Sequence, residues 1–164
     1  MSHEDGWMQL DLIRQQHNSR DSAFDYDKKF RYAWDSMPSN DDSAFIYSAL
    51  RDGHEVARAL VLTKPLRLTG YTAPADQLVT ELEHIEVRSG RRRQGIGRAL
   101  LGELVRRHGR LYALSSAEAV QFYRSLEWHE FRRAEGHSPA NAELFVSPAP
   151  QTKCRDRPQP TLTG

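Results

Sequence analysis

Hydrophobic and polar residues alternate with two different periods along this chain, and these periods predict where strands and helices lie. A two-residue period is typical of a strand with one buried face, and a period near 3.6 residues is typical of an amphipathic helix. Strands are expected on this basis at residues 7–15, 43–50, 55–63, 81–87, 110–114, 128–132 and 142–146. Helices are expected at residues 22–37 and 95–108 and around residues 119–126. The order of these elements predicts a mixed α/β sheet with helices packed against it.

Short polar motifs mark where some of these elements begin and end. Asp52-Gly53 lies between two predicted strands and is typical of a two-residue hairpin turn. Ser115 and Glu118 have the spacing of a capping box, which predicts that a helix begins there. Both motifs agree with the elements that the periodicity predicts.

The composition is typical of a single cytoplasmic domain. With 164 residues the chain is long enough for one domain with a core, expected at residues 1–147, whereas the Pro-rich residues 148–164 are expected to be disordered. The single cysteine, Cys154, excludes an intramolecular disulfide and fits a reducing compartment. No apolar run reaches membrane-spanning length, so no membrane partner is expected. Lys and Arg number 23 and Asp and Glu 22, so the overall charge favours no particular partner.

Arginines and glycines concentrate between a predicted strand and a predicted helix, in the stretch from Val87 to Leu101. A helix N-terminus exposes backbone N–H groups and a partial positive charge, and both favour an anion. Glycine lets the backbone approach that anion closely, and arginine adds charge and forked hydrogen-bond donors. The stretch is therefore predicted to bind a phosphate or pyrophosphate group.

Two common nucleotide-binding loops do not fit this stretch. A dinucleotide-binding turn, Gly-x-Gly-x-x-Gly, would need glycine where Leu100 stands and would lie near the first strand. A nucleoside triphosphate loop ends in Gly-Lys-Ser/Thr, which is absent. A third pattern, Arg/Gln-x-x-Gly-x-Gly/Ala, is met by Arg92-Arg93-Gln94-Gly95-Ile96-Gly97. In this stretch the sequence resembles the GNAT superfamily of acyl-CoA-dependent N-acetyltransferases.

The resemblance extends in order from about residue 80 to residue 131. Its downstream part is Phe122-Tyr123-Arg124-Ser125-Leu126-Glu127-Trp128, where the family commonly has aromatic-Tyr-x-x-Leu-Gly-Phe. Glu127 stands where glycine is usual, and Trp128 keeps a large apolar side chain where phenylalanine is usual. The resemblance implies a mixed, mostly antiparallel central sheet of six to seven strands, with helices on both faces and a splay between the fourth and fifth strands.

The resemblance also implies that acetyl-CoA is the cosubstrate. Its pyrophosphate would lie over the backbone of the arginine–glycine stretch. The residues implied are Arg92, Arg93, Gln94, Gly95, Ile96, Gly97 and Arg98. Arg88, Arg91 or Arg92 would meet the additional phosphate on the ribose.

The pantetheine arm of acetyl-CoA would bond to the strand that precedes the arginines. The resemblance implies bonds to the exposed backbone of Ile85, Glu86 and Val87, with the Glu86 side chain in solvent. The apolar positions of this strand break strict alternation after Leu82, so a β-bulge is expected. Ser116 lies where the family often has an asparagine that binds the same arm.

Candidate catalytic residues lie near the expected thioester. Tyr123 is the candidate acid, because a phenol near the sulfur can donate a proton to the leaving thiolate. Glu81 or Glu83 is the candidate base, since a carboxylate with a raised pKa can accept the ammonium proton. His84 is an alternative base, and ordered water is another.

The function expected from this resemblance is acetyl transfer to a primary amine of a small molecule or peptide, by direct attack in a ternary complex. The alternative is a non-catalytic CoA-binding, regulatory or protein-interaction module on the same fold, which Glu127 and the divergent N-terminal half motivate. Nucleic-acid binding is not expected, because no aromatic residues interleave the arginines and the net charge is only +1. The histidines lack metal-ligand spacing, so no metal is expected. Family members often pair through sheet edges, which leaves a homodimer open.

Overall fold

The computed structural model describes residues 8–15, 30, 34, 42–64, 71, 80–131 and 143–150. The helix expected at residues 22–37 lies outside the described residues apart from Phe30 and Trp34. The tail expected at residues 148–164, with Cys154, lies outside them from residue 151 onward.

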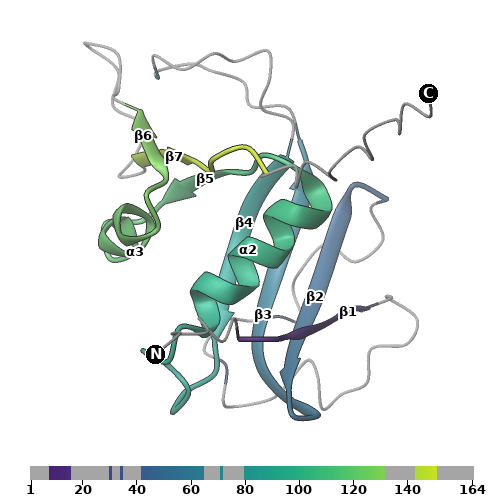
Figure 1. The fold of residues 1–164 in the computed structure, drawn as a ribbon. Coiled ribbons are helices and arrows are strands. Elements are labelled where there is room, and N and C mark those ends of the chain that lie inside the picture. Colours follow the sequence, from purple (N-terminus) through teal and green to yellow (C-terminus); the bar gives the residue numbers. More distant parts are fainter. Residues whose placement is uncertain are drawn as a thin grey trace, which may run out of the picture.

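The described strands form one seven-stranded sheet (Figure 1). The strands are β1 (Asp11–Gln15), β2 (Ala44–Arg51), β3 (His54–Thr63), β4 (Thr80–Val87), β5 (Tyr112–Ser115), β6 (His129–Phe131) and β7 (Glu143–Val146). Their spatial order is β1-β2-β3-β4-β5-β7-β6. Neighbouring strands are antiparallel except β4 and β5, which are parallel. The expected mixed, mostly antiparallel sheet is therefore confirmed.

The turn between β2 and β3 is the hairpin that the Asp52-Gly53 step predicts. Asp52 has φ 53° and Gly53 has φ 75°. Positive φ at both central residues is the requirement of a type I′ turn, whose twist matches that of paired strands. Pairing then continues from Arg51 opposite His54 along both strands.

The two described helices pack on one face of the sheet, and aromatic side chains pack on the other. The longer helix, α2 (Ile96–His108), lies across the sheet (Figure 1). Its buried residues are Ile96, Leu100, Leu101 and Leu104, at the helical spacing seen in the sequence. The shorter helix, α3 (Val120–Ser125), adds Tyr123 to the same hydrophobic cluster. On the opposite face Phe30 and Trp34 pack against Ile46 and Leu60.

The fourth and fifth strands separate soon after they meet. β4 and β5 share one register pair, Glu81 with Tyr112, whereas β3 accompanies β4 along its length. The β3–β4 ladder shifts register between Leu60 and Val61, which makes Glu83 the extra residue of a β-bulge. Both the splay and the bulge expected from the sequence are confirmed.

The start of α3 differs from the capping box expected at Ser115. Ser115 is the last residue of β5, where it pairs with Glu143, and its hydroxyl donates to the Ser116 carbonyl at 2.9 Å. The helix begins at Val120, and its N-cap, Ala119, makes no side-chain cap bond. The capping-box prediction is wrong because strand pairing takes Ser115 into the sheet.

The chain leaves α3 through a left-handed turn at the position where the resemblance expects glycine. Glu127 has φ 59°. Its N–H donates to the Arg124 carbonyl at 3.1 Å, and the Trp128 N–H donates to the Tyr123 carbonyl at 3.3 Å. These two bonds form a Schellman motif, whose usual apolar contact is supplied by the Tyr123 and Trp128 rings, 5.2 Å apart. The turn therefore persists with glutamate, at some cost in backbone strain.

Candidate active site

The loop that joins β4 to α2 ends in a helix N-terminus with uncapped N–H groups. Gly95 is the N-cap, with φ 79°, and no side chain caps the helix. The Ala99 N–H donates to the Gly95 carbonyl at 3.0 Å. The N–H groups of Ile96, Gly97 and Arg98 therefore have no acceptor inside the helix. Together with the helix dipole, such groups attract anions.

Gly97 keeps the backbone of this helix N-terminus closely packed. A Cβ atom at Gly97 would lie 3.1 Å from Cζ of Phe122 and 3.7 Å from Cγ2 of Val87. A Cβ atom at Gly102, further along the same helix, would meet nothing within 4 Å. The close packing of Phe122 and Val87 therefore requires glycine at position 97, whereas position 102 has room for a larger side chain.

Arg93 and Gln94 are the exposed residues just before the helix. Arg93 has φ 64°, in the left-handed region that residues other than glycine seldom adopt. Backbone strain of this kind is found preferentially at ligand-binding sites, where the surrounding structure holds it in place.

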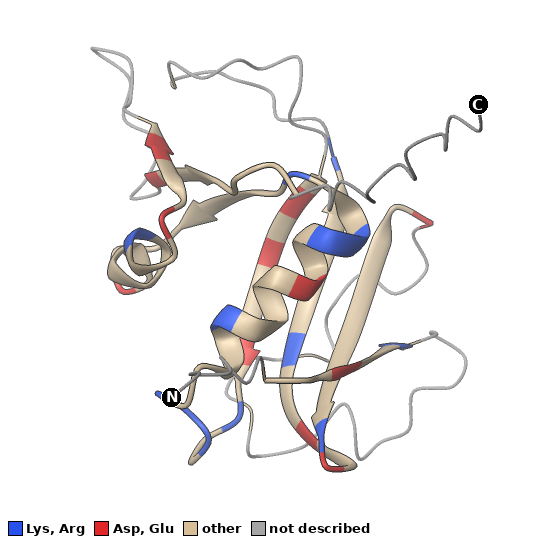
Figure 2. Ribbon diagram, viewed as in Figure 1, with Lys and Arg blue, Asp and Glu red and all other residues tan. Residues whose placement is uncertain are grey.

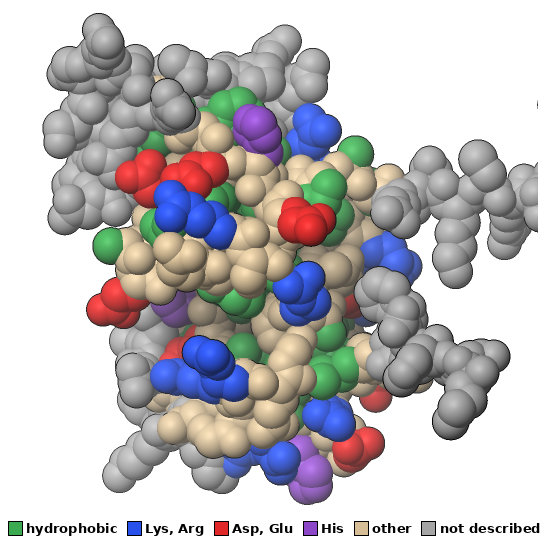
Figure 3. All heavy atoms as spheres, turned by 60° about the vertical axis from the view of Figure 1, so that its left-hand side comes forward, with side chains coloured by type: hydrophobic (Ala, Val, Ile, Leu, Met, Phe, Trp, Pro, Cys, Tyr) green, Lys and Arg blue, Asp and Glu red, His purple; other side chains and the backbone are tan. Residues whose placement is uncertain are grey.

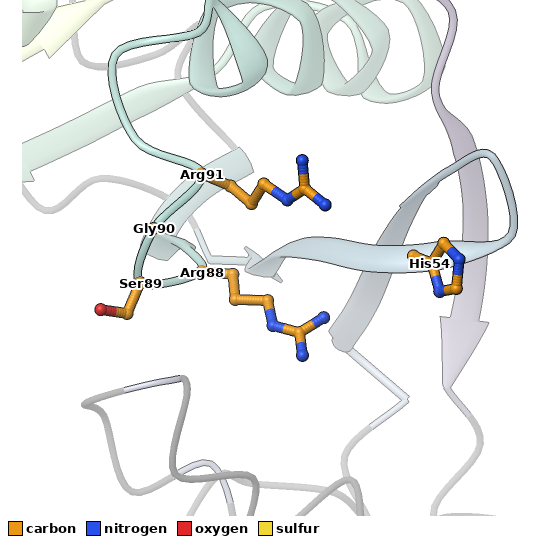
Figure 4. A pocket seen from close by; sticks show the side chains of 5 residues that line it. All are labelled: His54, Arg88, Ser89, Gly90 and Arg91. Atoms are coloured by element: carbon orange, nitrogen blue, oxygen red, sulfur yellow. The ribbon is translucent and has the colours of Figure 1, made fainter.

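Lys and Arg residues are concentrated in this loop, while acidic residues occur along β4 (Figure 2). Figure 3, which turns this side of the molecule forward, shows several Lys and Arg side chains in the lower half of the face. An open hollow of about 470 Å³ is lined by His54, Arg88, Ser89, Gly90 and Arg91. In it the Arg88 and Arg91 side chains extend in the same direction, toward the β2–β3 hairpin, and Ser89 points away (Figure 4). The Arg88 Nη1 donates to the Glu55 carbonyl at 3.0 Å. The Arg91 guanidinium and the remaining donors of Arg88 therefore face the hollow together.

Two further arginines, Arg92 and Arg98, are also held by the protein itself. The Arg92 Nε donates to the Val87 carbonyl at 3.2 Å, and its Nη2 lies 3.9 Å from Oε1 of Glu86. The Arg98 Nη2 donates to the Ser125 carbonyl, at the C-terminal end of α3, at 2.6 Å. Arg92 thus folds back onto the end of β4, and Arg98 ties α2 to α3.

The backbone of Ile85, Glu86 and Val87 forms the part of β4 from which β5 has separated. β3 pairs with these residues on one side, and no described strand pairs with them on the other. The Ile85 and Val87 side chains pack into the core beneath α2. The Glu86 side chain is buried on the opposite face, where its Oε2 accepts a hydrogen bond from Nε1 of Trp34 at 3.0 Å. The expected solvent exposure of Glu86 is therefore wrong, because Trp34 covers the carboxylate.

The two candidate bases lie where β4 and β5 meet. Glu81 is 3% exposed, and its Oε2 lies 3.2 Å from Nζ of Lys64. The Tyr112 hydroxyl donates to the Lys64 carbonyl at 2.8 Å and is also 3.2 Å from Oε2 of Glu81, so its one proton is shared. Loss of hydration and the negative charge of Glu81 raise the pKa of Glu83, while Lys64 acts in the opposite direction.

His84 lies on the same face as these carboxylates. The Trp34 ring meets it edge-on, with centroids 5.4 Å apart. Burial lowers the pKa of His84, and the charge of Glu86 partly offsets this. The imidazole therefore favours its neutral form more than an ordinary histidine does.

Tyr123, the candidate acid, is buried on the α2 side of the sheet with its ring stacked on Phe145 at 5.2 Å. Its hydroxyl has no hydrogen-bond partner among the described residues. Burial raises the pKa of the Tyr123 phenol, so the group stays protonated at neutral pH. A buried phenol without a partner can donate to a group that enters its surroundings.

Ser116 is exposed and directly follows β5. Its carbonyl accepts hydrogen bonds from the Ser115 hydroxyl at 2.9 Å and the Ala119 N–H at 3.0 Å. It therefore lies at the end of the strand that diverges from β4.

The candidate acid and the candidate bases occupy opposite faces of the sheet. Tyr123 belongs to the cluster beneath α2, whereas Glu81 contacts Tyr112, which packs with Leu144 and Val146 in a separate cluster. The unpaired parts of β4 and β5 lie between the two faces. A molecule in contact with both candidate groups would have to pass between these strands.

Sequence reasoning missed the buried ionic group behind this site. Arg58 is fully buried, and its Nε and Nη2 each lie 2.9 Å from an oxygen of Glu55. The Ser48 hydroxyl donates to Glu55 at 2.6 Å, and the Arg58 guanidinium lies 4.1 Å from the centre of the Phe30 ring. A charged residue inside an apolar run, Arg58 between Ala57 and Ala59, was the available signal.

The comparisons place the chain in a family. Residues 7–128 match the model of the acetyltransferase (GNAT) family. The chain therefore belongs to the GNAT family of acetyltransferases, and the enzyme class expected from the sequence is confirmed. A search of curated proteins found no match.

Solved structures of similar fold include three whose ligand is known. An acetyltransferase of Bacillus subtilis in complex with CoA has TM-score 0.59 and 10% identity, over 85% of this chain and 98% of that one. A GNAT family acetyltransferase of Elizabethkingia anophelis with acetyl-CoA bound has TM-score 0.55 and 11% identity, over 84% and 97%. The putative N-acetyltransferase YhhK of E. coli, bound to coenzyme A, has TM-score 0.53 and 18% identity, over 84% and 98%. At these identities the likeness supports the fold.

The described residues contain neither a membrane-spanning helix nor a cluster of metal-ligating side chains. None of their helices is both long and apolar enough to cross a membrane. No group of three or more His, Cys, Asp and Glu side chains among them is arranged to hold a metal ion.

Proposed function

We propose that this chain transfers an acetyl group from acetyl-CoA to a primary amine of a small molecule or peptide, by direct attack in a ternary complex. The observation that carries the proposal is the divergence of β4 from β5 beside the uncapped N-terminus of α2. An unpaired strand edge can bond an extended, amide-bearing chain such as pantetheine, and a helix N-terminus can hold a pyrophosphate. Both features belong to the same short stretch of chain, so one connected molecule could occupy them together.

In this proposal the loop before α2 holds the phosphates of acetyl-CoA. The N–H groups from Arg93 to Arg98 bind the pyrophosphate, where Gly97 permits close approach. Arg88 and Arg91 bind the additional phosphate in the hollow that they line. The CoA and acetyl-CoA complexes of proteins with the same fold support this choice of ligand.

The pantetheine arm of acetyl-CoA would bond to the unpaired edge of β4. The backbone of Ile85, Glu86 and Val87 supplies these bonds, and Ser116 lies at the end of the diverging strand. Arg92 must then release the Val87 carbonyl. This proposal accounts for the absence of a described strand partner along this edge.

The proposed chemistry needs one acid and one base. The amine nitrogen attacks the thioester carbonyl, so that a C–N bond forms and the C–S bond breaks. Tyr123 donates a proton to the leaving sulfur, a role suited to its protonated hydroxyl, which has no partner among the described residues. Glu81 or Glu83 accepts the proton that the amine loses.

Calorimetric titration with acetyl-CoA, followed by a thiol-release assay on an amine panel, tests this function. The panel contains polyamines, aminoglycosides, amino acids and peptide N-termini. We expect saturable binding and release of free thiol with at least one amine. Absence of binding at millimolar acetyl-CoA would contradict the donor assignment. Binding without thiol release would favour the alternative, a non-catalytic CoA-binding or protein-interaction module.

A further inference from the structure

Two carbonyl groups at the start of β3 hold Arg88 in place. The pairing of β2 with β3 shifts register after Ala49, which makes Val56 the extra residue of a β-bulge. The backbone N–H of Arg88 donates to the Val56 carbonyl at 2.8 Å, and its Nη1 donates to the Glu55 carbonyl at 3.0 Å. Both the main chain and the guanidinium group of Arg88 are therefore fixed. Since a guanidinium group has five N–H donors, several of them can still serve a ligand.

The support beneath Arg88 is itself held by side chains. The Glu55 carboxylate accepts hydrogen bonds at 2.9 Å from both Nε and Nη2 of the buried Arg58, and at 2.6 Å from the Ser48 hydroxyl. Glu55 is thus fixed through its side chain, while its carbonyl fixes Arg88. An arginine that is already ordered loses less conformational entropy on binding a ligand than a free surface arginine does. The contacts of Glu55 therefore prepare Arg88 for binding.

His54 forms the opposite wall of the hollow. It is the first residue of β3, directly after the hairpin turn, and it is exposed. The Arg88 and Arg91 side chains extend toward this hairpin from the loop that follows β4 (Figure 4). The five described residues that line the hollow include no Asp or Glu. The lining therefore offers an imidazole and two guanidinium groups to one ligand.

We propose that the hollow is a phosphomonoester site in which His54 binds the ligand together with Arg88 and Arg91, and through which the chain selects acetyl-CoA over 3′-dephospho-acetyl-CoA. This inference rests on the proposed function and adds to it a binding residue and a basis for selectivity. A phosphomonoester carries up to two negative charges and three terminal oxygens, which suits a site with several cationic donors. The imidazole of His54 supplies one further N–H donor.

The binding of the two cofactor forms, measured by calorimetry, tests this selectivity. The wild-type chain should bind acetyl-CoA roughly tenfold or more tightly than 3′-dephospho-acetyl-CoA, because the dephospho form makes no charge-assisted bonds in the hollow. His54→Ala should weaken acetyl-CoA binding about three- to tenfold and leave the binding of the dephospho form unchanged. His129→Ala, at an exposed histidine of β6, is the matched control and should change neither. Equal affinities of the wild-type chain for the two forms, or equal losses for both in His54→Ala, would overturn the proposal.

Arg88→Lys tests the importance of the prepared guanidinium group. Lysine keeps the positive charge but lacks the fork that bonds the Glu55 carbonyl and a phosphate at the same time. The variant should bind acetyl-CoA roughly tenfold more weakly and the dephospho form as the wild-type chain does. Unchanged affinity for acetyl-CoA would overturn the proposal.

Phosphorus-31 NMR gives a readout that does not depend on turnover. The 3′-phosphate and the pyrophosphate of acetyl-CoA have separate resonances, and binding to the wild-type chain should shift both. In His54→Ala the shift of the 3′-phosphate resonance should become smaller, while that of the pyrophosphate stays. A shifted pyrophosphate beside an unshifted 3′-phosphate in the wild-type complex would overturn the proposal and leave the proposed function intact. Absence of binding by either cofactor form would instead contradict the proposed function itself.

Discussion

Tyr112 and Glu81 are in contact at the point where the fourth and fifth strands separate. The phenol oxygen lies 3.2 Å from Oε2 of Glu81, and the two residues form the one register pair between the described strands β4 and β5. The backbone ladder ends there, so the two strands diverge toward Val87 and Ser115. The contact therefore closes the narrow end of the splay and places both candidate bases beside it.

Replacing the candidate acid should separate catalysis from stability. Tyr123→Phe should lower kcat roughly 10²-fold, because the leaving sulfur loses its proton donor. The free energy of unfolding should stay the same or rise by up to about 1 kcal/mol, since a buried hydroxyl with no described partner is removed. Enzyme assays and urea denaturation measure the two effects. Equal losses of turnover and acetyl-CoA affinity would mean that the tyrosine serves mainly as a structural residue.

Two glycines of the same helix form a matched pair for testing the phosphate site. Gly97→Ala should weaken acetyl-CoA binding at least about tenfold, because its Cβ would lie 3.1 Å from the Phe122 ring and disturb the close approach. Gly102→Ala should bind normally and gain about 1 kcal/mol of stability, since it has open space in a helix interior. Calorimetry and thermal denaturation check both variants. Equal affinities would argue against the helix N-terminus as the pyrophosphate site.

Glycine in place of Glu127, the residue with positive φ after α3, should make the protein more stable. Glu127→Gly relieves a strain of about 1–2 kcal/mol and adds a backbone entropy cost of about 0.5–1 kcal/mol. We expect a net gain of about 0.5–1 kcal/mol in the free energy of unfolding by chemical denaturation. Glu118→Gly, at an exposed turn residue without positive φ, is the control and should bring no gain.

Breaking the buried ion pair should be costly. Arg58→Met leaves the Glu55 carboxylate without its two guanidinium bonds, and a loss of about 3 kcal/mol is expected in urea denaturation. The double variant Arg58→Met with Glu55→Gln should lose less, because no unpaired charge remains. Equal losses for the single and double variants would show that Arg58 acts through packing on Phe30 and Trp34 alone.

Stability should fall as the medium becomes acidic, in part through one histidine. Nε2 of His108 lies 2.8 Å from the Tyr47 hydroxyl, and burial, with Arg107 and Arg14, lowers the pKa of His108 from its ordinary 6.5. Below pH 6.5 the unfolded chain therefore binds this proton more readily than the folded one, so stability is lost as the pH falls.

Unfolding free energies measured at several pH values between 5 and 8 give the slope of stability against pH. His108→Gln should reduce it, since the variant has no proton to bind in either state. His129→Gln, at an exposed residue of β6, is the control and should keep the slope. An unchanged slope in His108→Gln would contradict the assignment.

Much of the fold follows from the sequence because its signals are local. The period of apolar residues located α2, the Asp52-Gly53 step located the β2–β3 turn, and the broken alternation after Leu82 located the bulge. The arginine–glycine stretch likewise predicted an anion site, and the uncapped N-terminus of α2 lies there, since a loop and the first turn of a helix involve consecutive residues. The capping-box prediction at Ser115 failed because this residue pairs with β7, a strand distant in sequence.

The sequence by itself therefore determined the order of the elements and the family to which the chain belongs. The tertiary structure decided which groups surround each carboxylate: Trp34 covers Glu86, and Tyr112 and Lys64 contact Glu81. The physical reason is one of range. Helix and turn formation depend on residues a few positions apart, whereas the ionisation of a carboxylate depends on the charges and donors that strand order brings within a few ångströms of it.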